Sequence, residues 1–358
     1  MALPLFDNGA RKKRDQMLAI DLGSRTTKAV VVQRRGNDFV LCAFALLDAP
    51  IYDKTLSLEL LTEHLRTVTQ SLGSKVKLTT LAVGVNDSLV RHVDMPKIPM
   101  EEMRQVLKFN SKNYLQQDLT GHVFDCCVLT RQGAAGSAEA PKSAAAAQRQ
   151  KVLVAGAKKQ LVDDFIEASK AVGLVADHVI PSLVCPANSF EMAMPEVYSR
   201  EAVALVDVGF KSSFISLLQE GEFILGRVVT LGGDRLTAGL AENMNISYAE
   251  AEGIKVGMAQ EVQPQMEALV TPLGRELRAS IDFFEHQQDR PVSRVYVSGA
   301  SANSEYVLQA LQNELMVECR TWNPATSLQL ALPEDKAAQM PQIASQLSVA
   351  LGAAFAAF

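Results

Sequence analysis

The feature that most constrains the fold of this chain is a short pattern that occurs twice. In "MLAIDLGSRTTKAVVVQ" (residues 17–33) an apolar run ends at Asp21, Gly23 and hydroxyl residues follow, and a second apolar run begins. "ALVDVGFKSSFISLL" repeats this order around Asp207 and Gly209, and the two aspartates are 207 − 21 = 186 positions apart. One such pattern alone predicts an ordinary hairpin turn. The pair predicts two related lobes whose loop tips face one cleft.

The residue types at these tips indicate a phosphate site. Glycine lets the main chain turn with its N–H groups exposed and lets a ligand approach closely, and hydroxyl side chains add hydrogen-bond donors. Lys28, at the end of the first tip, can neutralise phosphate charge. Asp21 and Asp207 can hold Mg²⁺ through its water molecules, because this ion prefers oxygen ligands and keeps several waters. The tips therefore predict bound phosphate with Mg²⁺.

Composition excludes several classes of protein. The formal net charge of −5 gives no support to a nucleic-acid partner, which usually needs a broad basic surface. The dense basic run at 11–14 favours a solvated tail over a membrane contact.

No apolar run is long enough for a spanning helix, and the first fifteen residues contain no apolar core of a signal peptide, so we expect a cytoplasmic protein. Scattered cysteines without a C-x-x-C pair, and isolated histidines, predict core thiols in a reducing compartment and no zinc or iron site.

Periodicity and punctuation divide the chain into segments. The sequence predicts a helix over "SLELLTEHLRTVTQSLG", another after Pro99 with Glu101 and Glu102 in its first turn, and a last helix over "QIASQLSVALGAAFAAF". The second of these carries an apolar stripe of Met103, Val106, Leu107, Tyr114 and Leu115. The expected organisation is a flexible leader (1–16), a first-lobe core (17–87), an inserted subdomain (88–176) with a mobile Ala-rich loop (131–150), a connecting helix (177–200), a second-lobe core (201–234), its helical subdomain (235–290), and the rest of the second lobe with the C-terminal helix (291–358).

Longer stretches carry a family resemblance. "DLGSRTTK" and "DVGFKSS" resemble the two phosphate loops of the superfamily of actin, sugar kinases and heat-shock chaperones, and "VYVSGASANS" resembles its adenosine loop. "GRVVTLGGDRLTAGLAENMNISYAEAEGIK" resembles the PilM proteins of type IV pilus assembly and, less closely, the FtsA cell-division protein. "VRHVDMPKIPMEEMRQVLKFNSKNYL" also resembles PilM. The resemblance runs from about Met17 to the C-terminus and implies an α/β, actin-like (ribonuclease H-like) fold of two lobes, with an inserted α+β subdomain in the first.

The resemblance also implies a ligand, ATP with Mg²⁺, clamped between the lobes. The two acids hold the metal ion through water. Glu252 and Lys255 match a pair that approaches ribose and adenine, although the same spacing equally suits a surface ion pair on a helix. The residues implied to bind the nucleotide are Asp21, Gly23, Ser24, Arg25, Thr26, Thr27, Lys28, Asp207, Gly209, Lys211, Ser212, Ser213, Gly232, Gly233, Asp234, Glu252, Lys255, Gly299, Ala300 and Ser301.

Three departures from the superfamily pattern bear on activity. Lys211 and Ala300 stand where glycine is usual, which adds bulk or charge near the ligand, and Lys211 is a candidate phosphate ligand itself. Pro181 stands where relatives place an acid that orients the attacking water. Losing a general base removes a rate factor of roughly 10²–10⁴. We therefore expect ATP binding with slow or absent hydrolysis, and no catalytic residue is assigned.

The function that the resemblance implies is a scaffold of type IV pilus assembly. A groove formed by residues 88–129 and the first lobe would receive the N-terminal cytoplasmic segment of a PilN-type inner-membrane protein, which would place the chain at the inner membrane through its partner. Three alternatives remain open at this point: an FtsA-like filament protein, a type II secretion counterpart, and a sugar-kinase-like phosphotransferase with Asp177 as a weak candidate base.

Overall fold

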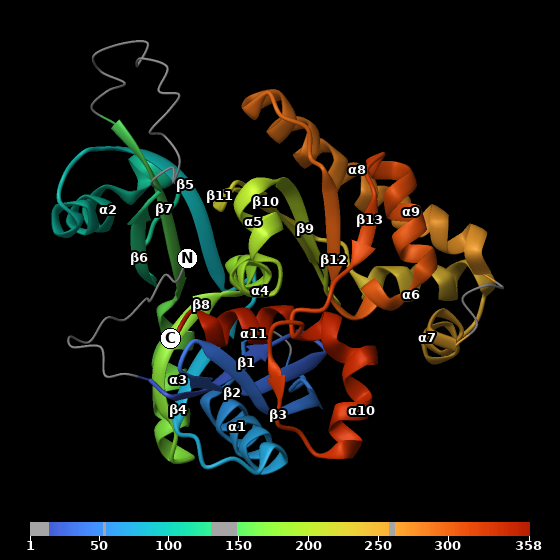
Figure 1. Ribbon diagram of the computed structural model, residues 1–358, viewed down its shortest axis with the longest axis horizontal. Helices are drawn as coiled ribbons and strands as arrows, with labels where there is room; N and C mark the ends of the chain where they lie inside the picture. The colour runs from blue at the N-terminus through green and yellow to red at the C-terminus, as the bar shows by residue number, and fades with distance from the viewer. Residues whose placement is uncertain (1–13, 53–54, 130–148, 258–261) are drawn as a thin grey trace.

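The computed structural model describes residues 14–52, 55–129, 149–257 and 262–358. The expected leader lies outside the described residues as far as position 13, and so does the predicted mobile loop as far as position 148. Figure 1 shows three sheets with helices around them.

Two of the sheets repeat one topology. The first contains β1 (Gln16–Leu22), β2 (Thr26–Arg35), β3 (Asp38–Asp48), β4 (Leu78–Val83), β8 (Val175–Pro181) and β14 (Gln329–Leu330) in the order β14-β3-β2-β1-β4-β8. The second contains β9 (Ala202–Val208), β10 (Ser213–Gln219), β11 (Glu222–Val229), β12 (Arg294–Ser298) and β13 (Cys319–Thr321) in the order β11-β10-β9-β12-β13. In each, the first three strands form an antiparallel meander, and two further strands run parallel to its first strand. We call the units built on these sheets the first and second lobes.

The third sheet is smaller and belongs to the insertion. Strand β5 (Ser88–Pro96) pairs with β7 (Arg149–Lys158), which also pairs with β6 (His122–Val128), all antiparallel. Helix α2 (Met100–Leu115) covers this sheet, with glutamates in its first turn as predicted. Its expected stripe is confirmed, because Met103, Leu107 and Leu115 are buried and Val106 and Tyr114 are half-buried. A non-helical residue, Asn110, kinks the helix.

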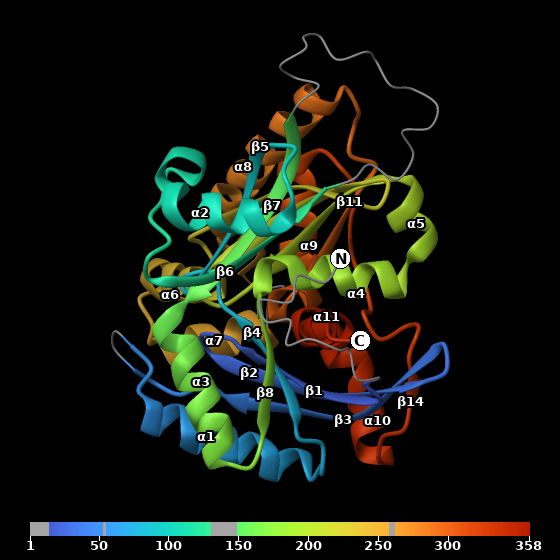
Figure 2. The ribbon, with the colours of Figure 1, turned by 90° about the vertical axis from the view of Figure 1, so that its left-hand side faces the viewer.

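The helices of the first lobe follow their sequence signals. Helix α1 (Leu58–Leu72) begins after Ser57, whose hydroxyl accepts a hydrogen bond from the N–H of Leu60, a cap typically worth about 1 kcal/mol. It ends at Gly73, where the φ of +58° suits glycine. Helix α3 (Lys159–Ala171) packs beside α1. These two helices cover one face of the first sheet (Figure 2).

The second lobe is covered by a separate group of helices. These are α5 (Pro195–Arg200), α6 (Gly233–Met244), α7 (Tyr248–Gly257), α8 (Gln263–Gln288) and α9 (Glu305–Leu315). The buried side of α8, which includes Leu273, Leu277 and Ile281, packs into a core shared with β9 and β12. The core of this lobe is therefore distinct from the core beneath α1 and α3.

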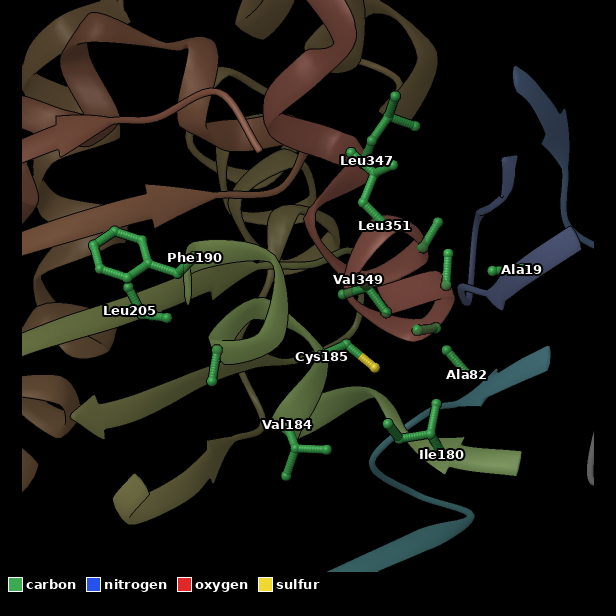
Figure 3. Close-up of a cluster of buried hydrophobic side chains, with 14 of the residues drawn as sticks. Ala19, Ala82, Ile180, Val184, Cys185, Phe190, Leu205, Leu347, Val349 and Leu351 are labelled. Atoms are coloured by element: carbon green, nitrogen blue, oxygen red, sulfur yellow. The ribbon is translucent and has the colours of Figure 1, made fainter. Parts of the chain in front are cut away.

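Two helices lie between the lobes and join their cores. Helices α4 (Cys185–Ala193) and α11 (Ser348–Phe355) pack against each other at the centre of the molecule (Figure 1). A Cβ added at Gly352 would lie 1.8 Å from the carbonyl oxygen of Cys185, so only glycine permits this approach. The side chains drawn in Figure 3, from Ala19 of β1 to Leu205 of β9, form one continuous core around this crossing. The crossing therefore holds the lobes together.

The structure differs from the expected segment boundaries in two places. Helix α3 and strand β8 belong with the first sheet, although the inserted subdomain was expected to extend to 176. Strand β14 pairs with β3, and α11 packs on β1, β2 and β4, so the end of the chain returns to the first lobe. The expected last helix, residues 342–358, is also interrupted: it starts within the end of α10 (Glu334–Ile343), continues as a 3-10 turn (Ala344–Leu347) and becomes α-helical again in α11. Within the described ranges, no helix is long and apolar enough to span a membrane.

Candidate functional site

The first tip, between β1 and β2, places a lysine on an acid. Asp21 is the second-last residue of β1 and is directly opposite Lys28 of β2. The ammonium of Lys28 donates to Oδ2 of Asp21 at 3.1 Å, and Asp21 is only 5% exposed. Burial by itself would lower the pKa of Lys28, but attraction to Asp21 and Asp207 outweighs burial and raises it. Lys28 thus remains charged and feels the acids of both tips.

The second tip, between β9 and β10, surrounds its acid with hydroxyl groups. Asp207 is the second-last residue of β9 and is buried, and its Oδ2 accepts hydrogen bonds from Ser298 at 2.8 Å and Ser348 at 3.1 Å. Burial raises the pKa of Asp207, and the repulsion of Asp21 acts in the same direction, while Lys28 and the two hydroxyls oppose them. Both acids therefore contribute to one electrostatic environment between the lobes.

Each tip turns on a glycine that its own backbone requires. A Cβ at Gly23 would lie 2.5 Å from the carbonyl oxygen of Thr26, and a Cβ at Gly209 would lie 2.6 Å from that of Ser212. A real Cβ cannot come so close, so both tips need glycine for the same reason. The predicted repeat in the sequence is thus a repeat in local geometry.

The hydroxyl side chains of the tips divide into inward and outward groups. Thr27 is buried and its Oγ1 lies 2.7 Å from Nε2 of His64 in α1, while Ser213 donates to the carbonyl oxygen of Leu231 at 2.7 Å. Ser24 is exposed, and Thr26 and Ser212 are half-buried. The first group braces the tips from beneath, and the second group lies nearer the surface.

The G-G-D turn at the start of α6 packs on the second tip. The N–H of Gly233 donates to the carbonyl oxygen of Gly209 and the N–H of Asp234 donates to that of Phe210, both at 2.9 Å. The carboxylate of Asp234 accepts from Lys211 at 2.7 Å and from the hydroxyl of Tyr248 at 2.8 Å. The turn and the tip are thereby held as one unit.

Glu252 and Lys255 form more than a surface ion pair. The ammonium of Lys255 lies 2.7 Å from Oε2 of Glu252 and 2.7 Å from Oγ1 of Thr237, and its side chain is 14% exposed. Oε1 of Glu252 lies 3.3 Å from the guanidinium of Arg25, which belongs to the first tip. Burial would raise the pKa of Glu252, but the hydrogen bonds from Lys255 and Thr237 outweigh it and lower the pKa. The pair is linked to the other lobe.

The remaining predicted residues follow β12. Gly299 has a φ of +93°, and a Cβ there would lie 2.4 Å from the carbonyl oxygen of Val208. Ala300 and Ser301 begin a 3-10 turn, Ala300–Asn303. A Cβ at Gly233 would lie 3.3 Å from Oγ of Ser301 and 3.8 Å from Nζ of Lys255. The structure thus brings this loop, the G-G-D turn and Lys255 together around the bare backbone of Gly233.

The donor set fits a nucleotide better than a metal ion held by protein alone. Lys28, Arg25, glycine backbones and hydroxyls suit phosphate oxygens. In the part of the chain that the structure describes, no three His, Cys, Asp or Glu side chains gather as a metal site. Asp21 and Asp207 would therefore reach Mg²⁺ only with water and phosphate as its other ligands.

Two further predicted positions lie on β8. Pro181 ends this strand in register with Val83 of β4, and Ala82 of β4 pairs with Asp21 of β1, so Pro181 lies at the same end of the sheet as the first tip. Asp177, the candidate base of a sugar kinase, is bound by Arg14 at 3.0 Å and lies 2.8 Å from Nδ1 of His178.

Some residues of the site were not predicted from the sequence. Thr237, Ser298 and Ser348 support predicted residues directly, and Phe210 and Tyr248 contact them. Ser298 adjoins the predicted adenosine loop, and Tyr248 lies in the PilM-like stretch, so local signals for both existed. Ser348 lies 141 positions from Asp207, and no local pattern points to it.

Comparisons with known proteins support the predicted fold. A family model described as type IV pilus assembly protein PilM matches residues 19–358. Among solved structures, a chain of a "PilM-PilN type IV pilus biogenesis complex" is 22% identical, with a TM-score of 0.81 over 97% of this chain and 99% of that one. The ethanolamine utilization protein EutJ from Carboxydothermus hydrogenoformans is 15% identical, with a TM-score of 0.57 over 97% and 91%. The predicted α/β, actin-like fold is confirmed.

Proposed function

Because this chain belongs to the PilM family of type IV pilus assembly proteins, we propose that it binds Mg-ATP between its lobes and a PilN-type protein on its surface. The observation that carries the first part is the convergence of the two tips. Lys28 of the first lobe is attracted by the acids of both lobes, and Arg25 of the first lobe forms an ion pair with Glu252 of the second. A triphosphate between the tips would contact both lobes at once.

The roles of the binding residues follow from their positions. Lys28 and the backbone of Gly23, Ser24, Thr26 and Gly209 would hold phosphate oxygens. Glu252 and Lys255 would approach the ribose, and the loop 299–301 with the turn 232–234 would hold adenine. Asp21 and Asp207 would hold Mg²⁺ through water. The bound metal ion would screen the phosphate charge from these acids.

We expect little hydrolysis of the bound ATP. Pro181, at the tip-bearing end of the first sheet, has no group that can accept a proton from water. A general base contributes a factor of roughly 10²–10⁴ to such reactions. ATP would then act by fixing the orientation of the lobes, which fits a scaffold better than an enzyme that turns over.

The partner proposal rests on family membership and on the fold. The PilM–PilN complex described above contains a chain of the same fold, and the two chains match over nearly the whole length of each. The inserted subdomain offers α2, whose kink at Asn110 borders a hollow of about 330 Å³ lined by Phe109, Lys112 and Thr120 among others. The side chain of Phe109 is 75% exposed. Binding of a cytoplasmic PilN segment by this part of the first lobe would place the protein at the inner membrane.

Two titrations test the proposal. Calorimetry with Mg-ATP on the wild type and on Asp21→Asn measures nucleotide binding. Asp163→Asn, at an exposed side chain of α3, is the control. Titration with an N-terminal PilN peptide, with and without Mg-ATP, measures the partner. We expect saturable ATP binding that Asp21→Asn weakens and Asp163→Asn does not. Failure of the wild type to bind ATP contradicts the first part, and failure to bind the peptide in both conditions contradicts the second.

A further inference from the structure

Arg25 is the counterpart of Lys211 in the repeated tips. The offset of 186 that relates Asp21 to Asp207 also relates Arg25 to Lys211, since 25 + 186 = 211. Lys211 stays within its own lobe, where its ammonium lies 2.7 Å from the carboxylate of Asp234. Arg25 instead leaves the first lobe. Two cations at equivalent positions thus pair with carboxylates in different places, Lys211 within its own lobe and Arg25 in the other lobe.

Among the described residues, the Arg25 side chain forms an ion pair and a ring contact with the second lobe, whereas its backbone is bonded within the first lobe. Its carbonyl oxygen accepts a hydrogen bond from the N–H of Ala49 at 2.9 Å, which fixes the base of the side chain. The guanidinium lies 3.3 Å from Oε1 of Glu252, and its Cζ lies 5.0 Å from the centre of the Phe210 ring. The Arg25 side chain is 43% exposed, so it retains room to move.

Glu252 does not need Arg25 for charge balance. Its other carboxylate oxygen is bound by Lys255 at 2.7 Å and by the hydroxyl of Thr237. A variant without the guanidinium therefore leaves no unpaired carboxylate on α7. The Arg25–Glu252 ion pair can therefore be replaced by a contact with a ligand, because Glu252 keeps its other partners and Arg25 is partly exposed to solvent.

We propose that Arg25 is a specificity-determining residue, which makes the site favour phosphate-bearing adenine nucleotides over adenosine. The inference rests on the proposed ATP site. When a ribose engages Glu252, Arg25 loses a carboxylate partner. A nucleotide replaces that partner with phosphate oxygens beside the same tip, whereas adenosine has no phosphate group that could pair with the guanidinium. A guanidinium binds phosphate with charge-assisted hydrogen bonds, so the exchange favours the nucleotide.

The test compares two ligands on three variants. Calorimetry measures Mg-ATP directly and adenosine by displacement, on the wild type, Arg25→Gln, Lys211→Gln and Arg66→Gln. Lys211→Gln removes the equivalent cation that stays in its own lobe, and Arg66→Gln removes an exposed cation on α1. Circular dichroism and thermal melting establish that each variant is folded.

We expect opposite changes for the two ligands in Arg25→Gln. The dissociation constant for Mg-ATP rises about tenfold, and that for adenosine falls a few-fold because no ion pair has to break. Lys211→Gln weakens Mg-ATP without improving adenosine, and Arg66→Gln changes neither. If both ligands move in the same direction by the same factor in Arg25→Gln, the inference is overturned while the ATP site stands. If the wild type binds no Mg-ATP, the proposed function itself fails.

Discussion

The two tips share one backbone pattern but stabilise their acids in different ways. Asp21 is neutralised by an ammonium group, that of Lys28, whereas Asp207 is held by the hydroxyls of Ser298 and Ser348. The register of the sheets explains the difference. Lys28 is directly opposite Asp21 on β2, while Phe214 occupies that place beside Asp207 on β10.

The parallel neighbours differ in the complementary way. Asp21 pairs with Ala82 of β4, and Asp207 pairs with Ser298 of β12. The neighbouring strands of each sheet therefore supply one polar partner, from the antiparallel side in the first lobe and from the parallel side in the second, and Ser348 of α11 adds another to Asp207. A repeated fold fixes where the acids lie, and the residues at neighbouring register positions decide their charge environment.

The largest effect is expected from removing the lysine of the first tip. Lys28→Met leaves Asp21 buried without its ion-pair partner, and such a change typically costs about 3 kcal/mol or more in the free energy of unfolding. Lys211→Met is the matched change, and we expect less than about 1 kcal/mol because its side chain is 57% exposed. Urea unfolding measures both. Equal losses would show that the tips are electrostatically alike after all.

A smaller effect is expected from removing a hydroxyl of the second tip. Ser298→Ala takes one hydrogen bond from the buried carboxylate of Asp207 but leaves that of Ser348, so we expect a loss of about 2 kcal/mol. The complementary variant, Ala82→Ser, places a hydroxyl at the equivalent position beside Asp21. Thermal or urea unfolding compares the two. No loss in Ser298→Ala would contradict the role given to this hydroxyl.

The smallest effect is a pH dependence confined to the first tip. Burial lowers the pKa of His64, which contacts Thr27, while the hydroxyl of Ser213 in the second tip donates to a carbonyl oxygen, which does not titrate. Between the ordinary pKa near 6.5 and the lower folded value, the unfolded chain binds more protons, so stability falls as pH falls through this window. His64→Gln should lose less stability than the wild type between pH 7 and pH 5. If the wild type and His64→Gln lose the same stability between pH 7 and pH 5, His64 does not cause this pH dependence.

Much of the fold could be predicted because its signals are local. The apolar runs around Asp21 and Asp207, the cap at Ser57 and the glycine at the end of α1 all follow from residues close in sequence. Sheet membership is not local. Residues 177–181 were expected to begin the connecting helix but belong to strand β8, which pairs with β4. Strand β14 pairs with a strand almost three hundred positions away. For that reason the expected boundaries of the inserted subdomain and of the second lobe differ from those in the structure.

The candidate site was predictable in its backbone and less so in its side-chain partners. Glycines such as Gly23 and Gly299 are required by close approach or by positive φ, and short motifs record those requirements. The partners of Asp207 come from positions 91 and 141 residues later, and Arg25 meets Glu252 only because the lobes face each other. Such pairs depend on how the lobes are placed, which no single motif encodes.

In the proposed complex, both lobes contact the same nucleotide. The most direct measurement is calorimetric binding of Mg-ATP to one variant from each lobe, Asp21→Asn in the first and Gly233→Ala in the second. Gly233→Ala adds a methyl group between Ser301 and Lys255, where the nucleotide is proposed to lie. We predict that each change alone raises the dissociation constant by about tenfold or more, equivalent to about 1.4 kcal/mol. Binding that stays at the wild-type level in either variant would contradict a site shared by the two lobes.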